Sequence, residues 1–291
     1  MPARFDYYAP TSLGEAVELL DRHGEEARVL AGGQSLVPLM KLRVGEPLGV
    51  LIDINRIEEL GYVKEEEGAL RIGALARHRD LENSDIIRGR YPLLADAAGT
   101  IGDLQIRNLG TPAGSLAHAD PASDWGAAFL AFESEVTATS AKGARSISLD
   151  DFFVDTFTTA LEPGEILTEI RVPTVGKGSG GSYKKLKRKA GDFATVGVAA
   201  QLQLDGDGAV IQPRIALTAV GATPFRAQDA EERLRDGPAD ETAVAEAARL
   251  AAQAAQPTRD LRGSSEYKRA MVEVFTRRAL ETALERARGG S

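Results

Sequence analysis

Two glycine-rich segments hold the residues best suited to binding a ligand. The first is Ala31–Gly32–Gly33–Gln34–Ser35, and the second, from Arg107 to Trp125, reads RNLGTPAGSLAHADPASDW. Glycine lets a backbone approach a ligand closely, and successive amides beside a Ser or Thr hydroxyl suit the charge of a pyrophosphate. Neither segment matches G-x-G-x-x-G or a P-loop. Each alone is also typical of a tight surface turn, but the pair in an α/β context indicates a dinucleotide site.

Other residues that could do chemistry are few. The histidines, His23, His78 and His118, form no i, i+4 pair and no metal-site pattern, although His118 follows the second glycine segment and could approach a ligand. No G-x-S-x-G elbow is present. Five of the six residues from Lys184 to Lys189 are basic, which indicates a solvated strand edge or a cation that faces a ligand. We predict no catalytic side chain and no metal site in this chain.

The composition narrows the class of protein. Of 291 residues, 43% are apolar and 27% charged, which is typical of globular proteins. A net charge of −8 argues against a nucleic-acid partner, because phosphate backbones require a basic surplus. The absence of cysteine excludes disulfides, thiolate catalysis and cysteine-ligated iron–sulfur clusters within the chain. Without a signal-peptide pattern or a run of about 20 apolar residues, a cytoplasmic protein with no transmembrane segment is expected.

Helices and strands that alternate must position these residues. Ser12 and Glu15 have capping-box spacing at the start of a first helix, which Gly24 is expected to end. Hydrophobic periodicity predicts the remaining elements of this half of the chain. Helices are expected at 85–101 and 121–132, and strands at 29–31, 49–55, 69–75, 134–140 and 165–173.

A Gly- and Ser-rich stretch, TVGKGSGGS at 174–182, is interpreted as a linker between two domains. The first domain spans 1–175, with subdomains of about 1–56 and 57–175, and the second spans 180–288. In the second, strand-like runs at 193–205 and 209–221 flank the turn from Asp205 to Gly208, and a helix is expected at 265–288. Strands followed by helices indicate an α+β domain with an antiparallel sheet.

Four longer segments occur in a fixed order along the chain. They read VLAGGQSLVPLMKLR, IGDLQIRNLGTPAGSLAHADPASDW, YKKLKRKAGDFATV and LRGSSEYKRAMVEVFTRRAL. Together they resemble the FAD-binding medium subunit of molybdenum hydroxylases. This family includes the flavoprotein subunits of carbon monoxide dehydrogenase and of bacterial quinoline or nicotine dehydrogenases, and the flavin domain of xanthine dehydrogenase. The resemblance covers the chain from Phe5 to about Arg288.

The resemblance implies an α+β fold of the vanillyl-alcohol-oxidase type (PCMH), in which two α/β subdomains hold FAD and a C-terminal antiparallel sheet carries helices. It also implies a set of FAD-binding residues. The pyrophosphate would lie on the two glycine loops, Asp124 would bind the sugar-alcohol chain, Ile101 and Leu167 would flank the ring system, and three further residues would line the isoalloxazine side. In full, the set is Ala31, Gly32, Gly33, Gln34, Ser35, Leu36, Ile101, Thr111, Ala113, Gly114, Ser115, Asp124, Leu167, Tyr183, Lys184 and Asp192.

One departure from the family pattern affects the second loop. Where the family usually has Thr-Ile-Gly-Gly, this chain has Thr111-Pro112-Ala113-Gly114. Ala113 adds a Cβ that limits positive φ, and Pro112 removes an amide donor. We therefore expect this loop to be shifted or to bind FAD less tightly.

As the resemblance implies, this chain would be the relay subunit of a larger enzyme. A large partner subunit would oxidise the substrate at a molybdenum–pterin centre, and a small one would carry two [2Fe–2S] clusters. FAD in this chain would receive the electrons and pass them to an external acceptor, with Lys184 helping to set the charge that reduced flavin experiences. The expected assembly is a heterohexamer, a dimer of heterotrimers. The substrate would be selected on another chain.

Two alternatives remain at the level of sequence. One is a stand-alone FAD-dependent oxidase of the same fold, which would bind its own substrate over the flavin ring. The other is a flavin-free assembly subunit whose altered second loop no longer binds the cofactor. Reduction of the isolated chain by an organic substrate distinguishes the first, and titration with FAD distinguishes the second.

Overall fold

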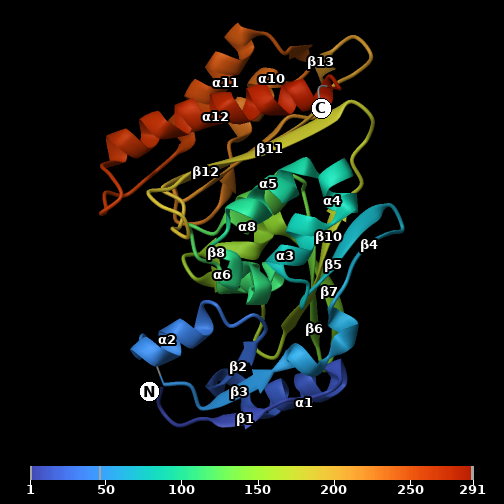
Figure 1. Ribbon diagram of the computed structural model, residues 1–291, viewed down its shortest axis with the longest axis vertical. Helices are drawn as coiled ribbons and strands as arrows, with labels where there is room; N and C mark the ends of the chain where they lie inside the picture. Colours follow the sequence, from blue (N-terminus) through green and yellow to red (C-terminus); the bar gives the residue numbers. More distant parts are fainter. Residues whose placement is uncertain (1, 46, 290–291) are drawn as a thin grey trace.

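The computed structural model describes residues 2–45 and 47–289, in which three larger β-sheets follow one another along the longest axis (Figure 1). The first sheet is parallel, with strand β3 between β1 and β2. Helix α1 packs on this sheet, and α2 follows the loop that leaves β2. The elements of this unit are β1 (Asp6–Tyr8), α1 (Leu13–His23), η1 (Gly24–Glu26), β2 (Ala27–Leu30), α2 (Leu36–Leu42), β3 (Val50–Asp53), η2 (Ile54–Arg56) and η3 (Glu58–Leu60).

Both ends of the first helix are confirmed. The Ser12 hydroxyl accepts a hydrogen bond from the Glu15 amide at 3.3 Å, and Gly24 ends α1 with a φ of 53°. The Glu15 carboxylate accepts from the amide of Thr11 rather than from that of Ser12, so the reciprocal bond of the capping box is displaced by one residue.

The middle unit is a five-stranded antiparallel sheet in the order β4-β5-β10-β6-β7, covered by short helices. Trp125, Tyr91 and Phe129 are its largest buried aromatic side chains. The elements are β4 (Val63–Glu66), β5 (Ala69–Gly73), α3 (His78–Asn83), α4 (Asp85–Arg90), α5 (Pro92–Thr100), α6 (Leu104–Leu109), α7 (Pro112–His118), α8 (Asp124–Leu130), β6 (Glu135–Ser140), β7 (Gly143–Ser148), α9 (Leu149–Phe152), β8 (Phe153–Asp155), β9 (Thr158–Thr159) and β10 (Ile166–Pro173).

Two predicted helices of this unit are wrong in extent. The helix expected at 85–101 is divided into α4 and α5, because Pro92 has no amide hydrogen and Tyr91 before it leaves the helical region, with φ −128° and ψ 55°. The helix expected from Pro121 begins at Asp124 instead. Asp120 forms a turn with Ala122 and Ser123, and this turn occupies the residues before α8.

The third unit is a four-stranded antiparallel sheet in the order β11-β12-β14-β15. Figure 1 shows α11 and α12 on one face of this sheet and α5 and α8 on the other. The elements are β11 (Ser179–Leu186), β12 (Val196–Gln203), β13 (Ala209–Val210), β14 (Arg214–Thr218), β15 (Phe225–Arg226), α10 (Gln228–Leu234), β16 (Gly237–Pro238), α11 (Glu241–Ala254) and α12 (Ser265–Ala287).

The two faces of this sheet belong to different hydrophobic cores. Tyr183, Ala199 and Ala216 join the core of the first two units. Val196, Val198 and their neighbours pack with α11 and α12. Successive residues of a strand point to opposite faces, so β11 contributes one set of side chains to each core.

The interpretation of residues 174–182 as a linker is wrong at its C-terminal end, because β11 begins at Ser179. Gly180 lies against α12, where a Cβ atom would be 2.2 Å from the Ala283 carbonyl oxygen and 2.3 Å from the Ala287 amide nitrogen. Glycine is required here for a close approach between helix and strand and not for flexibility.

The predicted turn after β12 is present, with the Asp205 amide donating to the Ala209 carbonyl at 2.9 Å. The strand expected at 209–221 is divided into β13, which pairs with β16, and β14, which pairs with β12. Pro213 lies between the two strands and cannot donate to a ladder. In residues 2–45 and 47–289, no helix is both long and apolar enough to cross a membrane.

Candidate functional site: a cavity between the three units

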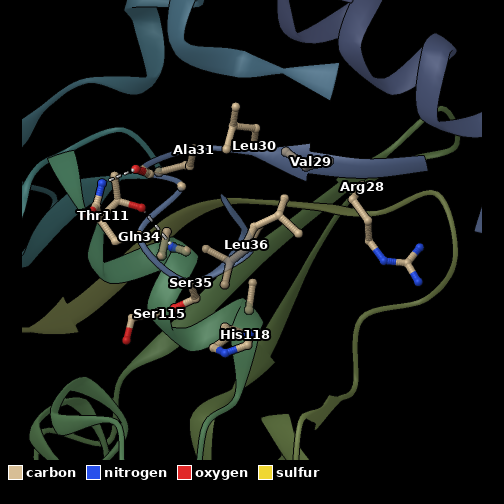
Figure 2. A pocket seen from close by; sticks show the side chains of 18 of the residues that line it. Arg28, Val29, Leu30, Ala31, Gln34, Ser35, Leu36, Thr111, Ser115 and His118 are labelled. Carbon is tan, nitrogen blue, oxygen red and sulfur yellow. Dashed lines mark hydrogen bonds between the residues drawn. The ribbon is translucent and has the colours of Figure 1, made fainter. Parts of the chain in front are cut away.

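A cavity of about 800 Å³ lies where the three units meet. The loops at 31–36 and 110–115 form part of its wall, together with the start of β10 and the segment 191–193 that follows β11. In Figure 2, Arg28 lies at one side of the view, and Thr111 and Ser115 lie at the other. A volume of this size is typical of sites that hold a cofactor, which are mostly concave and preformed.

The first loop offers backbone donors to the cavity. Gly33 has a φ of 70°, a conformation that favours glycine, and it turns the chain from β2 into α2. Within the part of the chain that the structure describes, the backbone amides of Gly33, Gln34 and Ser35 have no acceptor. Consecutive free amides are the kind of donor that a phosphate requires.

The second loop is the beginning of α7. Thr111 caps this helix, since its hydroxyl accepts a hydrogen bond from the Gly114 amide at 3.0 Å. A Cβ atom on Gly114 would lie 2.8 Å from that hydroxyl, so a larger residue at this position would require the Thr111 side chain to shift. The Ser115 hydroxyl lies 2.8 Å from that of Ser123, which fixes the next turn of the cavity wall.

The departure at Pro112 and Ala113 does not strain the backbone of the second loop, and the expected shift of that loop or weaker binding of FAD stays a prediction. Pro112 is the first residue of α7, where the amide hydrogen has no partner within the helix, and its fixed φ suits the helix. Ala113 lies in the first turn, is 2% exposed and is absent from the positive-φ residues of the described chain. A Cβ is therefore tolerated there.

The two loops touch each other through their backbones. A Cβ atom on Gly32 would lie 2.4 Å from the Leu109 carbonyl oxygen and 2.6 Å from the Gly110 Cα. Because the obstructing atoms are backbone, they cannot rotate away. The contact holds a loop of the first unit directly against a loop of the middle unit.

A buried ion pair forms the floor of the cavity. Lys185 Nζ lies 2.7 Å from Asp124 Oδ2, and these side chains are 2% and 6% exposed. The Tyr183 hydroxyl donates to Asp124 Oδ1 at 2.6 Å. Burial, and then the Asp124 charge, raises the pKa of Tyr183 well above its usual value, so this hydroxyl stays protonated and keeps donating.

Apolar and charged residues also line the cavity. Ile101, Leu167 and Phe193 are apolar residues of its wall. Asp192 also lines it, and its carboxylate pairs with Arg188 at 3.0 Å. The hydrogen bond and charge of Arg188 lower the pKa of Asp192 and keep it ionised.

Apart from Tyr183 and Lys184, every predicted site residue lines the cavity. Tyr183 is 3% exposed and lies behind Asp124. Lys184 lies between Tyr183 and Lys185 on β11, and strand alternation directs it to the opposite face. Lys185 occupies the position beside the cavity that the sequence interpretation gave to Lys184.

Sequence reasoning also missed His78. Its Nδ1 accepts a hydrogen bond from Trp125 Nε1 at 3.0 Å, and the ring lines the cavity beside Gly110. Burial, reinforced by the charges of Arg107 and Arg77, lowers the pKa of His78 to about 3. The imidazole is therefore neutral, with its proton on Nε2. Nothing in the local sequence distinguishes His78 from a surface histidine.

His118, which the sequence offered either as a ligand contact or as an ordinary polar loop residue, lines the cavity. Its ring centroid lies 5.2 Å from that of Phe157, and burial lowers its pKa. Figure 2 shows its side chain on α7, one turn beyond Ser115.

The cavity, with free backbone amides on one of its glycine loops, is of the kind that suits a phosphate-bearing ligand. Comparison with protein families is specific: residues 3–175 match the FAD binding domain in molybdopterin dehydrogenase, and residues 181–283 match the CO dehydrogenase flavoprotein C-terminal domain. The chain belongs to the family of FAD-binding medium subunits of molybdenum hydroxylases. Its fold is the mixed α+β fold of that family.

Individual relatives are similar to this chain over almost its whole length. The carbon monoxide dehydrogenase medium chain of Hydrogenophaga pseudoflava is 44% identical over 98% of this chain and 99% of its own length. The 6-hydroxypseudooxynicotine dehydrogenase complex subunit alpha of Paenarthrobacter nicotinovorans is 39% identical over 99% of this chain and 97% of its own length. Among solved structures, carbon monoxide dehydrogenase from Hydrogenophaga pseudoflava superposes with a TM-score of 0.95 at 46% identity, covering 98% of this chain and 99% of that one. Quinoline 2-oxidoreductase from Pseudomonas putida 86 superposes with a TM-score of 0.92 at 31% identity, covering 99% of each chain.

The residues present fit FAD. The cavity has the volume for a large cofactor, and one loop presents free amides of the kind that suit a pyrophosphate. The carboxylate of Asp124, although buried, reaches the cavity and can accept a hydrogen bond from a hydroxyl.

Proposed function

We propose that this flavoprotein subunit relays electrons from iron–sulfur clusters of a partner subunit, through FAD, to an external acceptor. FAD supplies the redox chemistry, since it can take up and release electrons, and the protein supplies placement and electrostatics. The observation that carries the proposal is the cavity between the three units, whose phosphate-binding loops and buried ion pair lie in a chain of this family.

The predicted contacts are distributed along the cavity. Backbone amides of residues 31–36 and the start of α7 hold the pyrophosphate, and Asp124 accepts a hydrogen bond from the sugar-alcohol chain. Ile101 and Leu167 flank the ring system, and Asp192 lies at its edge. This distribution is supported by the position of each of these residues in the cavity wall.

We assign to Lys185 the electrostatic role first given to Lys184. Its ammonium group is at the cavity floor, where the contact with Asp124 holds it in place. A flavin that gains negative charge on reduction would be stabilised by a cation placed in this way. Tyr183 acts indirectly, because it fixes the carboxylate that pairs with Lys185.

Every iron–sulfur cluster must lie on partners, because this chain has no cysteine. The proposed partners are a large subunit with a molybdenum–pterin cofactor and a small subunit with two [2Fe–2S] clusters, in a dimer of heterotrimers. Within this chain we propose an FAD-binding domain of residues 1–175 and a C-terminal domain of 180–288. The family matches of 3–175 and 181–283 support this division.

The test is reduction of the flavin with and without partners. The full chain, copurified with the products of neighbouring genes, should show the visible flavin spectrum and lose it anaerobically when the substrate of the large subunit is added. The same chain without partners should keep the spectrum of oxidised flavin. Bleaching of the isolated chain by an organic substrate would instead support a stand-alone oxidase. A chain that binds no FAD, alone or in its complex, would support a flavin-free assembly subunit.

A further inference from the structure

Two polar side chains connect the phosphate-binding loops outside the cavity. Asn55 follows the last strand of the first unit, and Arg77 precedes α3 of the middle unit. Asn55 Nδ2 donates to the Ala31 carbonyl oxygen at 2.8 Å, and Arg77 Nη1 donates to the Leu109 carbonyl oxygen at 2.5 Å. Arg77 Nη2 donates to Asn55 Oδ1 at 2.6 Å, which closes the connection between the two loops.

Both side chains are themselves held in place. Asp53 Oδ1 accepts from the Asn55 amide at 2.9 Å and from Asn55 Nδ2 at 2.6 Å, so the amide group of Asn55 has one orientation in which all its bonds form. The backbone amide of Arg77 donates to Asp80 Oδ2 at 2.8 Å. The planar fork of a guanidinium, which an ammonium group lacks, lets Arg77 contact Asn55 and Leu109 at once.

The bond to Ala31 has a consequence for the cavity. In a trans peptide the carbonyl and the following amide point in opposite directions. With the Ala31 carbonyl held toward Asn55, the Gly32 amide points away from it, and Gly32 lines the cavity. Arg77 and Asn55 are not among the residues that line the cavity, so they act through the loops.

We propose that Arg77 and Asn55 are positioning residues that set the spacing and peptide orientation of the two phosphate-binding loops, and thereby favour a ligand with two adjacent phosphates. This proposal rests on the proposed binding of FAD. A ligand that engages both loops needs their separation fixed before binding, since ordering them afterwards costs affinity. A ligand with a single phosphate depends less on that spacing.

The test compares affinity for FAD with affinity for FMN. The full chain, together with the subunits it assembles with, is stripped of flavin and titrated with each cofactor, while a thermal midpoint is measured without flavin. Arg77→Met removes both hydrogen bonds of the guanidinium, to the Leu109 carbonyl and to Asn55, and Arg77→Lys removes at least one of them. Asn55→Asp keeps a partner for Arg77 but places an acceptor opposite the Ala31 carbonyl. Arg56→Met, an exposed neighbour of Asn55, is the charge-matched control.

We expect Arg77→Met and Asn55→Asp to weaken FAD binding about tenfold or more and FMN binding by less than threefold, with Arg77→Lys no better than Arg77→Met and Arg56→Met like wild type. An unchanged ratio of FAD to FMN affinity in both Arg77→Met and Asn55→Asp would overturn the proposal, even if the thermal midpoint falls. A wild-type protein that binds no FAD overturns the proposed function and this inference with it. Tight wild-type binding with an unchanged ratio overturns this inference alone.

Discussion

Among the tyrosine–carboxylate hydrogen bonds of the described residues, those of Tyr183 and Tyr7 are chemically alike but differ in burial. Tyr183 donates to Asp124 at 2.6 Å in the cavity floor, whereas Tyr7, which is 55% exposed, donates to Asp53 at 2.7 Å. Replacing Tyr183 removes a donor from a carboxylate that water does not readily reach. Burial should therefore decide the cost of each substitution.

We expect Tyr183→Phe to lower the free energy of unfolding by about 1–3 kcal/mol, because a buried acceptor loses a bond. Tyr7→Phe should leave it unchanged within error, since water replaces the lost partner. Urea unfolding of both variants at neutral pH is the measurement. Equal losses in the two variants would show that the Asp124 site is hydrated.

His78 predicts a dependence of stability on pH. Its pKa is about 3 in the folded protein, below the usual value of about 6.5 in an unfolded chain. Between these values the unfolded state binds more protons, so stability rises with pH and falls as pH decreases through 6.5.

His78→Asn keeps an acceptor for Trp125 Nε1 but cannot titrate. Between pH 7.5 and 5.5, wild type should lose about 1.4 kcal/mol more of its unfolding free energy than His78→Asn. Urea unfolding at the two pH values measures the difference. Parallel losses would mean that His78 is protonated in the folded protein.

At the level of single residues, the sequence predicts the two glycine loops that line the cavity better than it predicts the floor of the cavity. A glycine next to Ser or Thr predicts a loop from the local sequence alone, without knowledge of the surrounding strands. Choosing between Lys184 and Lys185 instead requires knowing which face of β11 each occupies, and the linker interpretation concealed the start of that strand at Ser179. His78 acquires its environment from Trp125, 47 positions away, and no local pattern predicts this.

Among the elements, β11 shows how glycine composition misleads. A Gly-Ser stretch is typical of a flexible linker, yet Gly180 lies against the backbone of α12. A Gly- and Ser-rich composition can therefore reflect either backbone flexibility or close packing of backbones. The break at Pro92, in contrast, can be predicted from the sequence, because proline has no amide hydrogen. The apolar periodicity continues on both sides of Pro92, and it led to the prediction of a single helix.

Gly180→Ala should lower the free energy of unfolding by about 1–3 kcal/mol, because the new methyl group meets backbone atoms that must move. Gly206→Ala is the control, since a Cβ there meets nothing within 4 Å. Thermal or urea unfolding compares the two. A Gly180→Ala variant as stable as the control would mean that α12 shifts freely on the sheet.

At the scale of the whole molecule, an ion pair between Arg286 and Asp96 joins the last and first thirds of the described chain. Arg286 on α12 contacts both carboxylate oxygens of Asp96 on α5, at 2.7 and 3.1 Å, and donates to the Gly181 carbonyl at 2.6 Å. Asp96 also accepts from the Tyr183 amide at 3.2 Å. The terminal helix is thus connected to the strand that forms the cavity floor.

Arg286→Met should lower the free energy of unfolding by about 1 kcal/mol and increase hydrogen exchange in α12 and β11. Arg249→Met is the control, because Arg249 makes contacts of 2.7 and 3.1 Å with Glu246 within α11 and joins no two units. Its exchange pattern should match that of wild type. If both variants exchange alike, the Asp96 pair does not hold α12 in place.

Strand β11 has a consequence for exchanging parts of this protein with those of a relative. It lies in the segment matched as the C-terminal domain, yet Tyr183 and Lys185 complete a site whose Asp124 lies in the other matched segment. The two segments are therefore not interchangeable modules. A chimera that joins one half of this chain to the other half of a relative must preserve the contacts of Asp124 with Tyr183 and Lys185, and the pair of Arg286 with Asp96, so it depends on side chains far from the splice point.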